Sequence, residues 1–135
     1  MFAQSTGTIW ITDFLSIVYF KNRGVSFGLL ADQIAQSAAI FAALSAVLGF
    51  ALLIMAIRAS RFHEIAGFAM IAGGAFGNAF DRFWFGAVTD FIDFHVAGWH
   101  WPAFNFADIS IVIGAGLVLV GGFVRAPRPI NENRA

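Results

Sequence analysis

Residues 37–57 form an uninterrupted run of 21 amino acids without a charged side chain. An α-helix rises about 1.5 Å per residue, so a run of this length crosses a hydrocarbon core of roughly 30 Å. The rest of the chain agrees with a membrane environment, because 59% of its residues are hydrophobic and only 12% are charged. The sequence therefore predicts a transmembrane helix over 37–57.

Two further apolar segments follow this span. The first covers 65–82 and ends at Asp81 and Arg82, and the second covers 103–124, directly after Pro102. The stretch 83–102 between them mixes Asp, His, Gly and Trp, which is typical of a loop at the membrane interface, with its tryptophans at the headgroup level. The predicted fold class is an all-α polytopic membrane protein with three transmembrane helices in a single membrane domain, 1–135.

The two ends of the chain differ from these spans. Residues 1–13 are too polar for a span, and 9–20 are rich in β-branched and aromatic residues, which indicates short strands, with a turn at 22–24. Residues 125–135 carry two prolines and three arginines, so we expect a tail without helix. We predict a small β segment on the outer face and a tail in the cytoplasm.

The basic residues indicate the orientation of the spans. Five of the eight lysines and arginines lie in the connector after 37–57 or in the tail 125–135. The positive-inside tendency assigns these segments to the cytoplasm. Residues 1–35 and 83–102 are then extracytoplasmic.

Composition excludes several classes of function. Eight basic and eight acidic residues give a net charge of zero, which leaves no basic surplus for nucleic acid. The chain has no cysteine, so thiolate chemistry and disulfides are excluded. His63, His95 and His100 lack the paired spacing of metal ligands, and we interpret them as interface residues. No metal or cofactor is implied.

Polar side chains cluster at the ends of the second and third spans. Asn78 precedes Asp81 and Arg82 by three and four residues, so the three share one helix face. Asn105 and Asp108 have the same spacing at the start of the third span. Helix capping alone would explain Asn105 and Asp108, and pairing at the membrane boundary would explain Asp81 and Arg82. Glycines at 73, 74 and 77 indicate close helix packing.

Asp90 and Asp108 are the strongest candidates for chemistry. Both lie beside hydrocarbon-rich sequence, where a charge costs at least a few kcal/mol and usually marks a functional site with a partner nearby. Asp93 is more simply explained as a loop carboxylate in contact with water. Two adjacent carboxylates would share one proton, with Asp90 beside Phe91 holding it and Asp108 ionised near a helix N-terminus.

Four blocks in order carry a resemblance to a known family: KNRGVSFG at 21–28, GGAFGNAFDR at 73–82, GAVTDF at 86–91 and PAFNFAD at 102–108. Together they resemble the lipoprotein signal peptidases, or signal peptidase II. The resemblance covers roughly residues 9–124. It implies an aspartic endopeptidase of the bacterial inner membrane that cleaves prolipoproteins before the diacylglyceryl-modified cysteine, near the extracytoplasmic face.

The resemblance also implies roles for individual residues. Asp90 and Asp108 match the catalytic pair of the family. The positions that line the substrate site are Asn22, Asn78, Arg82 and Asn105, and the supporting positions are Gly24, Gly77, Asp81 and Ala107. The implied partners are the diacylglyceryl-modified prolipoprotein and membrane lipid, with the enzyme acting as a monomer.

One departure from the family concerns its first transmembrane helix, which carries an Asp-Gln-x-[Ser/Thr]-Lys motif. No segment of this sequence corresponds to it, so the chain has three spans where the family has four. We expect a start codon assigned too late or a natural truncation. The alternative interpretations are an N-terminally truncated homologue without activity and a small proton- or ion-coupled transport subunit, because buried aspartates also serve as relays.

Overall fold

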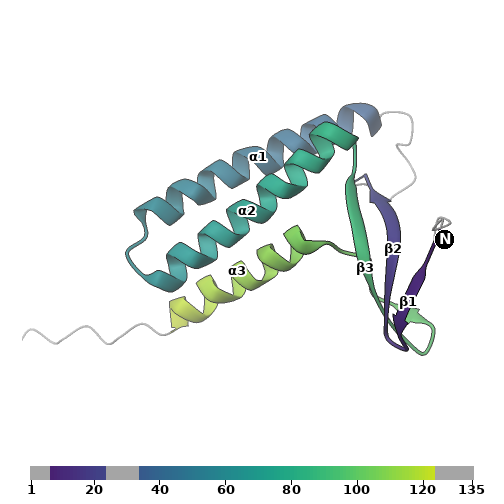
Figure 1. Ribbon diagram of the computed structural model, residues 1–135. Helices are drawn as coiled ribbons and strands as arrows, with labels where there is room; N and C mark the ends of the chain where they lie inside the picture. Colours follow the sequence, from purple (N-terminus) through teal and green to yellow (C-terminus); the bar gives the residue numbers. More distant parts are fainter. Residues whose placement is uncertain (1–6, 24–33, 124–135) are drawn as a thin grey trace, which may run out of the picture.

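The computed structural model describes residues 7–23 and 34–123, which form three helices and one antiparallel sheet (Figure 1). The helices are α1 (Ile34–Arg58), α2 (Phe62–Phe85) and α3 (Phe106–Phe123). The strands are β1 (Ile9–Thr12), β2 (Leu15–Asn22), β3 (Val88–Val96) and β4 (Trp99–His100), and the sheet order is β1-β2-β3-β4. The helices form a row with α2 in the middle, and the sheet stands at the end where α2 stops and α3 starts.

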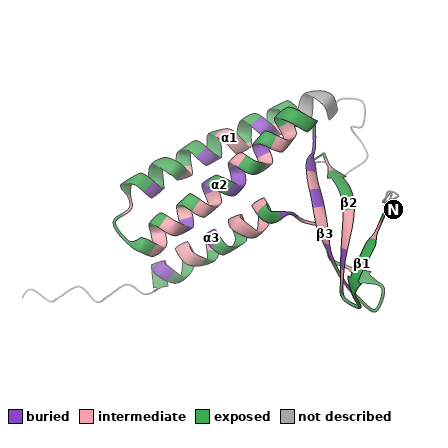
Figure 2. Ribbon diagram, viewed as in Figure 1, coloured by how far each residue is buried: buried purple, intermediate pink, exposed green. Residues whose placement is uncertain are grey.

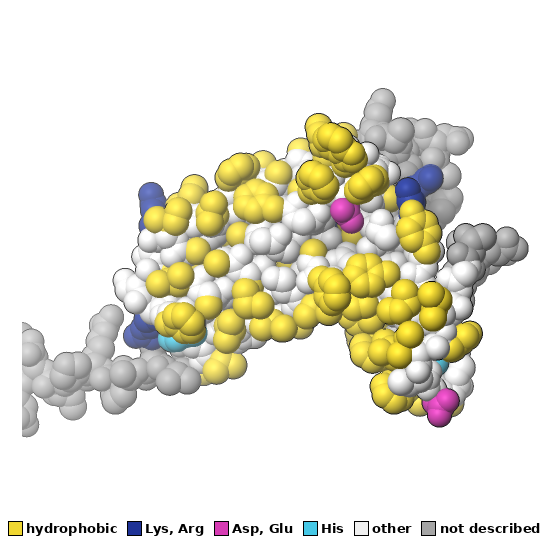
Figure 3. All heavy atoms as spheres, viewed as in Figure 1, with side chains coloured by type: hydrophobic (Ala, Val, Ile, Leu, Met, Phe, Trp, Pro, Cys, Tyr) yellow, Lys and Arg dark blue, Asp and Glu magenta, His cyan; other side chains and the backbone are white. Residues whose placement is uncertain are grey.

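The helices bury small side chains and expose large ones (Figure 2). Their buried hydrophobic residues are all alanines: Ala38, Ala42, Ala56, Ala72, Ala75 and Ala79. Large apolar side chains such as Val47, Phe50 and Ile57 are exposed, and hydrophobic side chains spread over the face of the row in Figure 3. Apolar side chains gain nothing by leaving an apolar solvent, so this distribution indicates helices surrounded by lipid.

Two of the described helices are long and apolar enough to cross a membrane. They cover Ala38–Arg58 and Phe106–Phe123, with mean hydropathies of 2.7 and 2.1. Only 17% and 11% of these stretches is buried inside the protein, whereas the core helix of a soluble protein would be mostly buried. These helices match the predicted spans at 37–57 and 103–124. The span predicted at 65–82 lies within α2, whose glycines and polar ends lower its hydropathy, so a count of three spans stays a prediction.

Close contact between α2 and α3 depends on glycines at their interface. A Cβ on Gly67 would lie 2.8 Å from the Gly114 carbonyl oxygen, and a Cβ on Gly114 would lie 2.6 Å from that of Gly67. Nearer the sheet, a Cβ on Gly74 would meet the Ala107 carbonyl oxygen. Close packing was predicted for Gly73, Gly74 and Gly77. It is confirmed for Gly74, because the backbone of α3 occupies the space of its missing side chain, and it is wrong for Gly73, where an added Cβ would meet nothing within 4 Å.

Gly74→Ala is expected to destabilise the protein, whereas Gly73→Ala is not. The added methyl at Gly74 overlaps the α3 backbone and comes within 2.6 Å of Ile111 Cγ1, but a methyl at Gly73 meets nothing within 4 Å. Overpacking of this kind typically costs about 1–3 kcal/mol. Thermal unfolding of both variants in one detergent measures the difference. Equal midpoints for the neighbouring variants would contradict a tight α2–α3 contact.

The predicted outer-face β segment forms β1 and β2 of the sheet. Their hairpin turn lies at Asp13 and Phe14. The turn predicted at 22–24 is wrong at its first residue, because Asn22 ends β2 and pairs with Val88 of β3. Gly24 and the tail 125–135 lie outside the described residues. The all-α class is not confirmed, because a four-stranded sheet accompanies the helices.

The structure also differs from the loop predicted over 83–102. Gly86 ends α2 with a φ of 70°, a left-handed conformation that suits glycine, and its N–H donates to the Arg82 carbonyl oxygen at 3.1 Å. The chain then enters β3 at Val88. Most of the predicted loop is therefore strand, in β3 and β4.

A β-bulge lies between β2 and β3 beside the carboxylates. Ile17 pairs with Ile92, but Phe20 pairs with Asp90, so three steps along β2 oppose two along β3. The extra residue lies in β2, and a bulge bends the strand that carries it. Along β3 the buried positions change from Val88 and Asp90 to Asp93 and His95, so two aspartates three residues apart are both buried.

Candidate functional site

Asp90, Asp108 and three predicted asparagines form one hydrogen-bonded network where the sheet meets α2 and α3. Asp90 comes from β3, and Asp108 from the first turn of α3. Asn22 comes from the end of β2, Asn78 from α2, and Asn105 from the residue before α3. The network therefore joins residues from both sides of the sheet–helix boundary.

Asn105 and Asp108 cap the start of α3 reciprocally. The Asn105 side-chain oxygen accepts from the backbone N–H groups of Ala107 at 2.7 Å and Asp108 at 3.1 Å. In return, the Asn105 backbone N–H donates to Asp108 Oδ2 at 3.2 Å. This is a capping box, in which both partners satisfy N–H groups that a helix start leaves free. The capping explanation for these two residues is thus correct for part of their contacts.

The amide nitrogen of Asn105 has a separate contact that capping does not explain. It donates to Asp90 Oδ1 at 2.8 Å and lies 3.3 Å from Asn78 Oδ1. One residue therefore binds Asp108 through its backbone and Asp90 through its side chain. Because Asn105 is buried, these contacts set the relative position of the two carboxyl groups.

The other two asparagines each hold one carboxyl group. Asn22 Nδ2 donates to Asp90 Oδ2 at 3.0 Å, and Asn78 Nδ2 donates to Asp108 Oδ1 at 2.9 Å. Asn22 sits diagonally from Asp90, because its direct cross-strand partner is Val88. Amide donors thus fix both carboxyl groups from neighbouring elements.

Arg82 and Asp81 form hydrogen bonds with different residues and not with each other. Arg82 Nη1 donates to the Asn78 carbonyl oxygen at 3.2 Å, which holds the guanidinium beside the network. Its Nε atom is buried and has no hydrogen-bond partner among the described residues. Asp81 Oδ2 accepts from the Thr89 N–H at 3.3 Å, next to Asp90. Within the described chain no ion pair joins Asp81 to Arg82, so boundary pairing does not explain them.

Asp90 is almost fully buried, with 1% of its surface exposed. Burial raises the pKa of Asp90 above its ordinary value, and the negative charge of Asp108 acts in the same direction. The amides of Asn22 and Asn105 and the charge of Arg82 lower this pKa, but burial has the largest effect. Asp90 therefore keeps its proton to a higher pH than an exposed aspartate does.

The supporting positions differ in their distance from the network. Ala107 donates its N–H to Asn105, and its side chain is the nearest neighbour of a Cβ built on Gly77, at 3.4 Å. A side chain at position 77 would make only ordinary contact with α3, so the approach of α3 does not require a glycine there. Gly24 lies outside the described residues.

A second polar cluster was missed by the sequence analysis. Asp93 is 6% exposed and accepts hydrogen bonds from Ser16 and His100, so the expected water-exposed carboxylate is wrong. His95 is buried as well and is not an interface residue. An alternation of apolar and polar residues along 88–96 would have indicated a strand with these residues on its buried face, but the sequence VTDFIDFHV does not alternate regularly.

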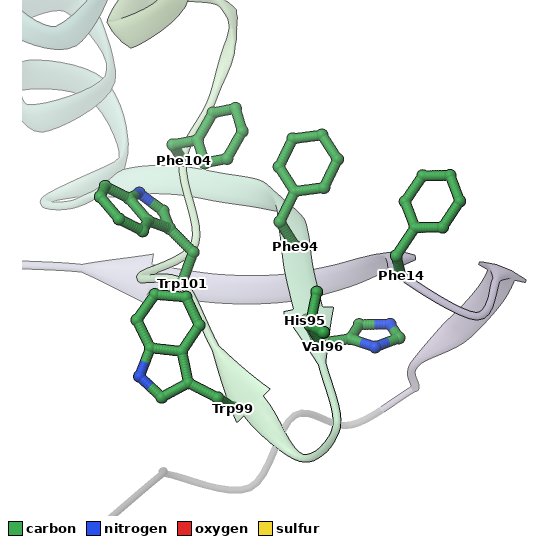
Figure 4. Close-up of a pocket in the computed structure, with 7 residues that line it drawn as sticks. All are labelled: Phe14, Phe94, His95, Val96, Trp99, Trp101 and Phe104. Carbon is green, nitrogen blue, oxygen red and sulfur yellow. The ribbon is translucent and has the colours of Figure 1, made fainter.

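An aromatic pocket of about 450 Å³ lies at the far end of the sheet (Figure 4). Its lining includes Phe14, Phe94, Trp99 and Trp101 but neither Asp90 nor Asp108. Trp99 and Trp101 are exposed, as expected for side chains at the membrane interface. The pocket is separate from the carboxylate network.

Comparison with known proteins shows the family to which the chain is similar. The family model described as signal peptidase (SPase) II matches residues 1–124. A lipoprotein signal peptidase of Yersinia enterocolitica is 42% identical over 82% of this chain and 67% of the relative. One from Photorhabdus laumondii is 41% identical over 82% and 68%.

Solved structures agree with the sequence comparisons. Two structures of a bacterial membrane enzyme match with a TM-score of 0.74 each. One is 25% identical and covers 98% of this chain and 80% of its own, and the other is 26% identical and covers 92% and 79%. With a family model over most of its length and relatives above 40% identity, the chain belongs to the signal peptidase II family.

Proposed function

We propose that this chain is an aspartic endopeptidase that removes the signal peptide of a bacterial prolipoprotein just before its diacylglyceryl-modified cysteine. The observation that carries the proposal is Asn105, which binds Asp90 through its amide and Asp108 through its backbone. Family membership supports the peptidase class, and relatives named lipoprotein signal peptidase support the substrate. The enzyme acts as a monomer surrounded by lipid.

The proposed chemistry uses one ionised and one protonated carboxyl group. The ionised Asp108 takes a proton from water as the water oxygen attacks the scissile carbonyl carbon, while Asp90 gives its proton to the carbonyl oxygen. The resulting tetrahedral diol collapses when its C–N bond breaks: the nitrogen takes the proton held by Asp108, and one hydroxyl of the diol returns its proton to Asp90 as the product carboxyl group forms. The raised pKa of Asp90 supports its role as the first acid.

The proposed orientation places this chemistry at the outer face of the inner membrane. The carboxylates lie at the end of the row opposite Arg58 and Arg61, the basic residues near the connector of α1 and α2. The positive-inside tendency assigns that connector to the cytoplasm. Precursor proteins cross the same membrane, so their cleavage sites arrive at the opposite, extracytoplasmic end.

The rate of cleavage is expected to rise with pH on an acid limb, pass through a maximum and fall again on an alkaline limb. Because burial raises the pKa of Asp90, its proton is lost above the ordinary aspartate value of about 3.9, and activity falls as the pH rises through the raised value. Protonation of the second carboxyl group causes the acid limb, and the pair titrates as a unit. A profile of kcat/KM with a single limb would contradict the shared proton.

Arg82→Ala is expected to raise KM about tenfold or more and to change kcat by less than about threefold. The guanidinium is held beside the network by Asn78, so a peptide bound at the two carboxyl groups lies next to its positive charge. Steady-state kinetics measure the effect, with Arg61→Ala at the other end of α2 as the control. An unchanged KM for Arg82→Ala would exclude this role.

The proposal is tested with the purified chain in lipid and a synthetic precursor peptide that carries a diacylglyceryl cysteine. Mass spectrometry should find one cut, on the N-terminal side of that cysteine. The same peptide with an unmodified cysteine is the control for recognition of the lipid. Folded protein that cuts neither peptide would overturn the proposed function, and equal cutting of both would overturn the substrate class.

A further inference from the structure

Asp93 is a second buried carboxylate in β3, and the proposed reaction does not use it. Its Oδ2 accepts from Ser16 Oγ and from His100 Nδ1, both at 2.9 Å. Ser16 belongs to β2 and His100 to β4, so one side chain joins three strands. A carboxylate has no proton to donate, so His100 must carry its hydrogen on Nδ1 in this contact.

His100 begins the segment that returns from the sheet to α3. Directly after it, the Trp101 N–H donates to the Phe94 carbonyl oxygen at 2.7 Å. Further along, Phe104 exchanges two backbone hydrogen bonds with Ile92, at 3.0 and 2.9 Å. Figure 4 shows Trp101 and Phe104 on this segment beside Phe94 of β3. The returning segment thus runs antiparallel along the strand that carries Asp90.

The residue after Phe104 is Asn105, which binds both Asp90 and Asp108. The position of Asn105 relative to Asp90 therefore depends on how firmly 100–104 is held against β3. The backbone bonds at 101 and 104 hold the middle and the end of this segment. At its beginning, His100 pairs with His95 between β3 and β4, and the Asp93–His100 side-chain contact adds to this pairing.

We propose that Asp93 and His100 are positioning residues, which clasp the returning segment to β3 and so fix Asn105 between the two carboxyl groups. This inference rests on the proposed function, because its effect on rate requires a peptidase. Ser16 supports the clasp by binding the same oxygen of Asp93. Displacement of a reacting group by about 1 Å can cost roughly 100-fold in rate, so a loosened segment would lower kcat.

His100→Asn and His100→Gln form a matched pair for the test. The amide nitrogen of Asn takes the place of Nδ1, which contacts Asp93, whereas the amide nitrogen of Gln takes the place of Nε2. We expect His100→Gln to lower kcat at least about tenfold with KM within about twofold, and His100→Asn to keep at least about a third of the wild-type kcat. Equal kcat values for the two variants would overturn the clasp.

Hydrogen exchange supplies a readout that does not require activity. In His100→Gln, the hydrogen-bonded backbone N–H groups of Trp101, Phe104 and Asn105 should exchange at least about tenfold faster than in the wild type, and in His100→Asn they should not. Uniformly faster exchange over the whole sheet, or a raised KM with unchanged kcat, would overturn the positioning role. If the wild type cuts no precursor, the proposed function fails, and exchange at 101–105 alone decides whether the clasp exists.

Discussion

Asp90→Asn and Asp108→Asn are each expected to lower kcat by about 10³-fold or more, while the Kd for a precursor peptide changes by less than about threefold. Proton transfer by a positioned side chain contributes about 10²–10⁴-fold, and neither amide can give or take the required proton. Size and shape are retained, so peptide contacts made by other residues remain. Single-turnover cleavage gives the chemical step, and equilibrium binding gives Kd.

Folding has to be measured with these variants, because both carboxyl groups accept amide hydrogen bonds. An Asn at 90 has one acceptor oxygen for the two donors Asn22 and Asn105, and a buried donor without a partner costs about 1–3 kcal/mol. Rates are therefore expressed per folded protein. Asp13→Asn, in the exposed turn between β1 and β2, is the matched control. Near wild-type turnover by either site variant would exclude its aspartate from the catalytic pair.

Asn105→Ser and Asn105→Asp are expected to lower kcat by about 100-fold. The N-terminus of α3 should stay capped in both variants. Ser and Asp are both good N-cap residues, so each can replace the side-chain oxygen that accepts from Ala107 and Asp108. Neither supplies the amide nitrogen that donates to Asp90. The Asn105→Asp variant also adds a negative charge beside two carboxyl groups, so its loss of kcat should exceed that of the Ser variant.

Asn105→Ala separates the two contributions of this residue. It removes the cap as well as the amide, so it should lose about 1 kcal/mol of stability relative to the Ser variant at a similar kcat. Thermal unfolding and steady-state kinetics of the three variants give both quantities. If the Ser variant had the stability of the Ala variant and the kcat of the wild type, Asn105 would have no role in holding Asp90.

The helices were predictable because their signal is local. A charge-free run over 37–57 and an apolar run after Pro102 predicted α1 and α3 within a few residues, and the spacing of Asn105 and Asp108 predicted their shared helix start. The strands after Gly86 were not found, because β3 is stabilised by pairing with β2, far away in the sequence. Asp90 and Asp93 are both buried but lie three residues apart, so the sequence of β3 lacks the regular alternation that would have indicated a strand.

The site was predictable to a different extent for each residue. Asp90 and Asp108 stand out because a charge beside apolar sequence is costly. Asn22 could be assigned only by family resemblance, since nothing local relates the end of β2 to a carboxylate 68 residues later. Asp93 and His100 could not be joined, because seven residues and the turn at Ala97 and Gly98 separate them.

The row arrangement of the helices has a consequence for how a substrate arrives. Within the described residues α1 and α3 both pack on α2 but do not contact each other, so the row has two open flanks along its length. In the proposed function, a signal sequence that already lies in the bilayer approaches the carboxylates sideways, along a flank of α2 that the described helices leave uncovered. For the proposed peptidase, the search takes place in two dimensions, and the membrane itself is the entrance to the site.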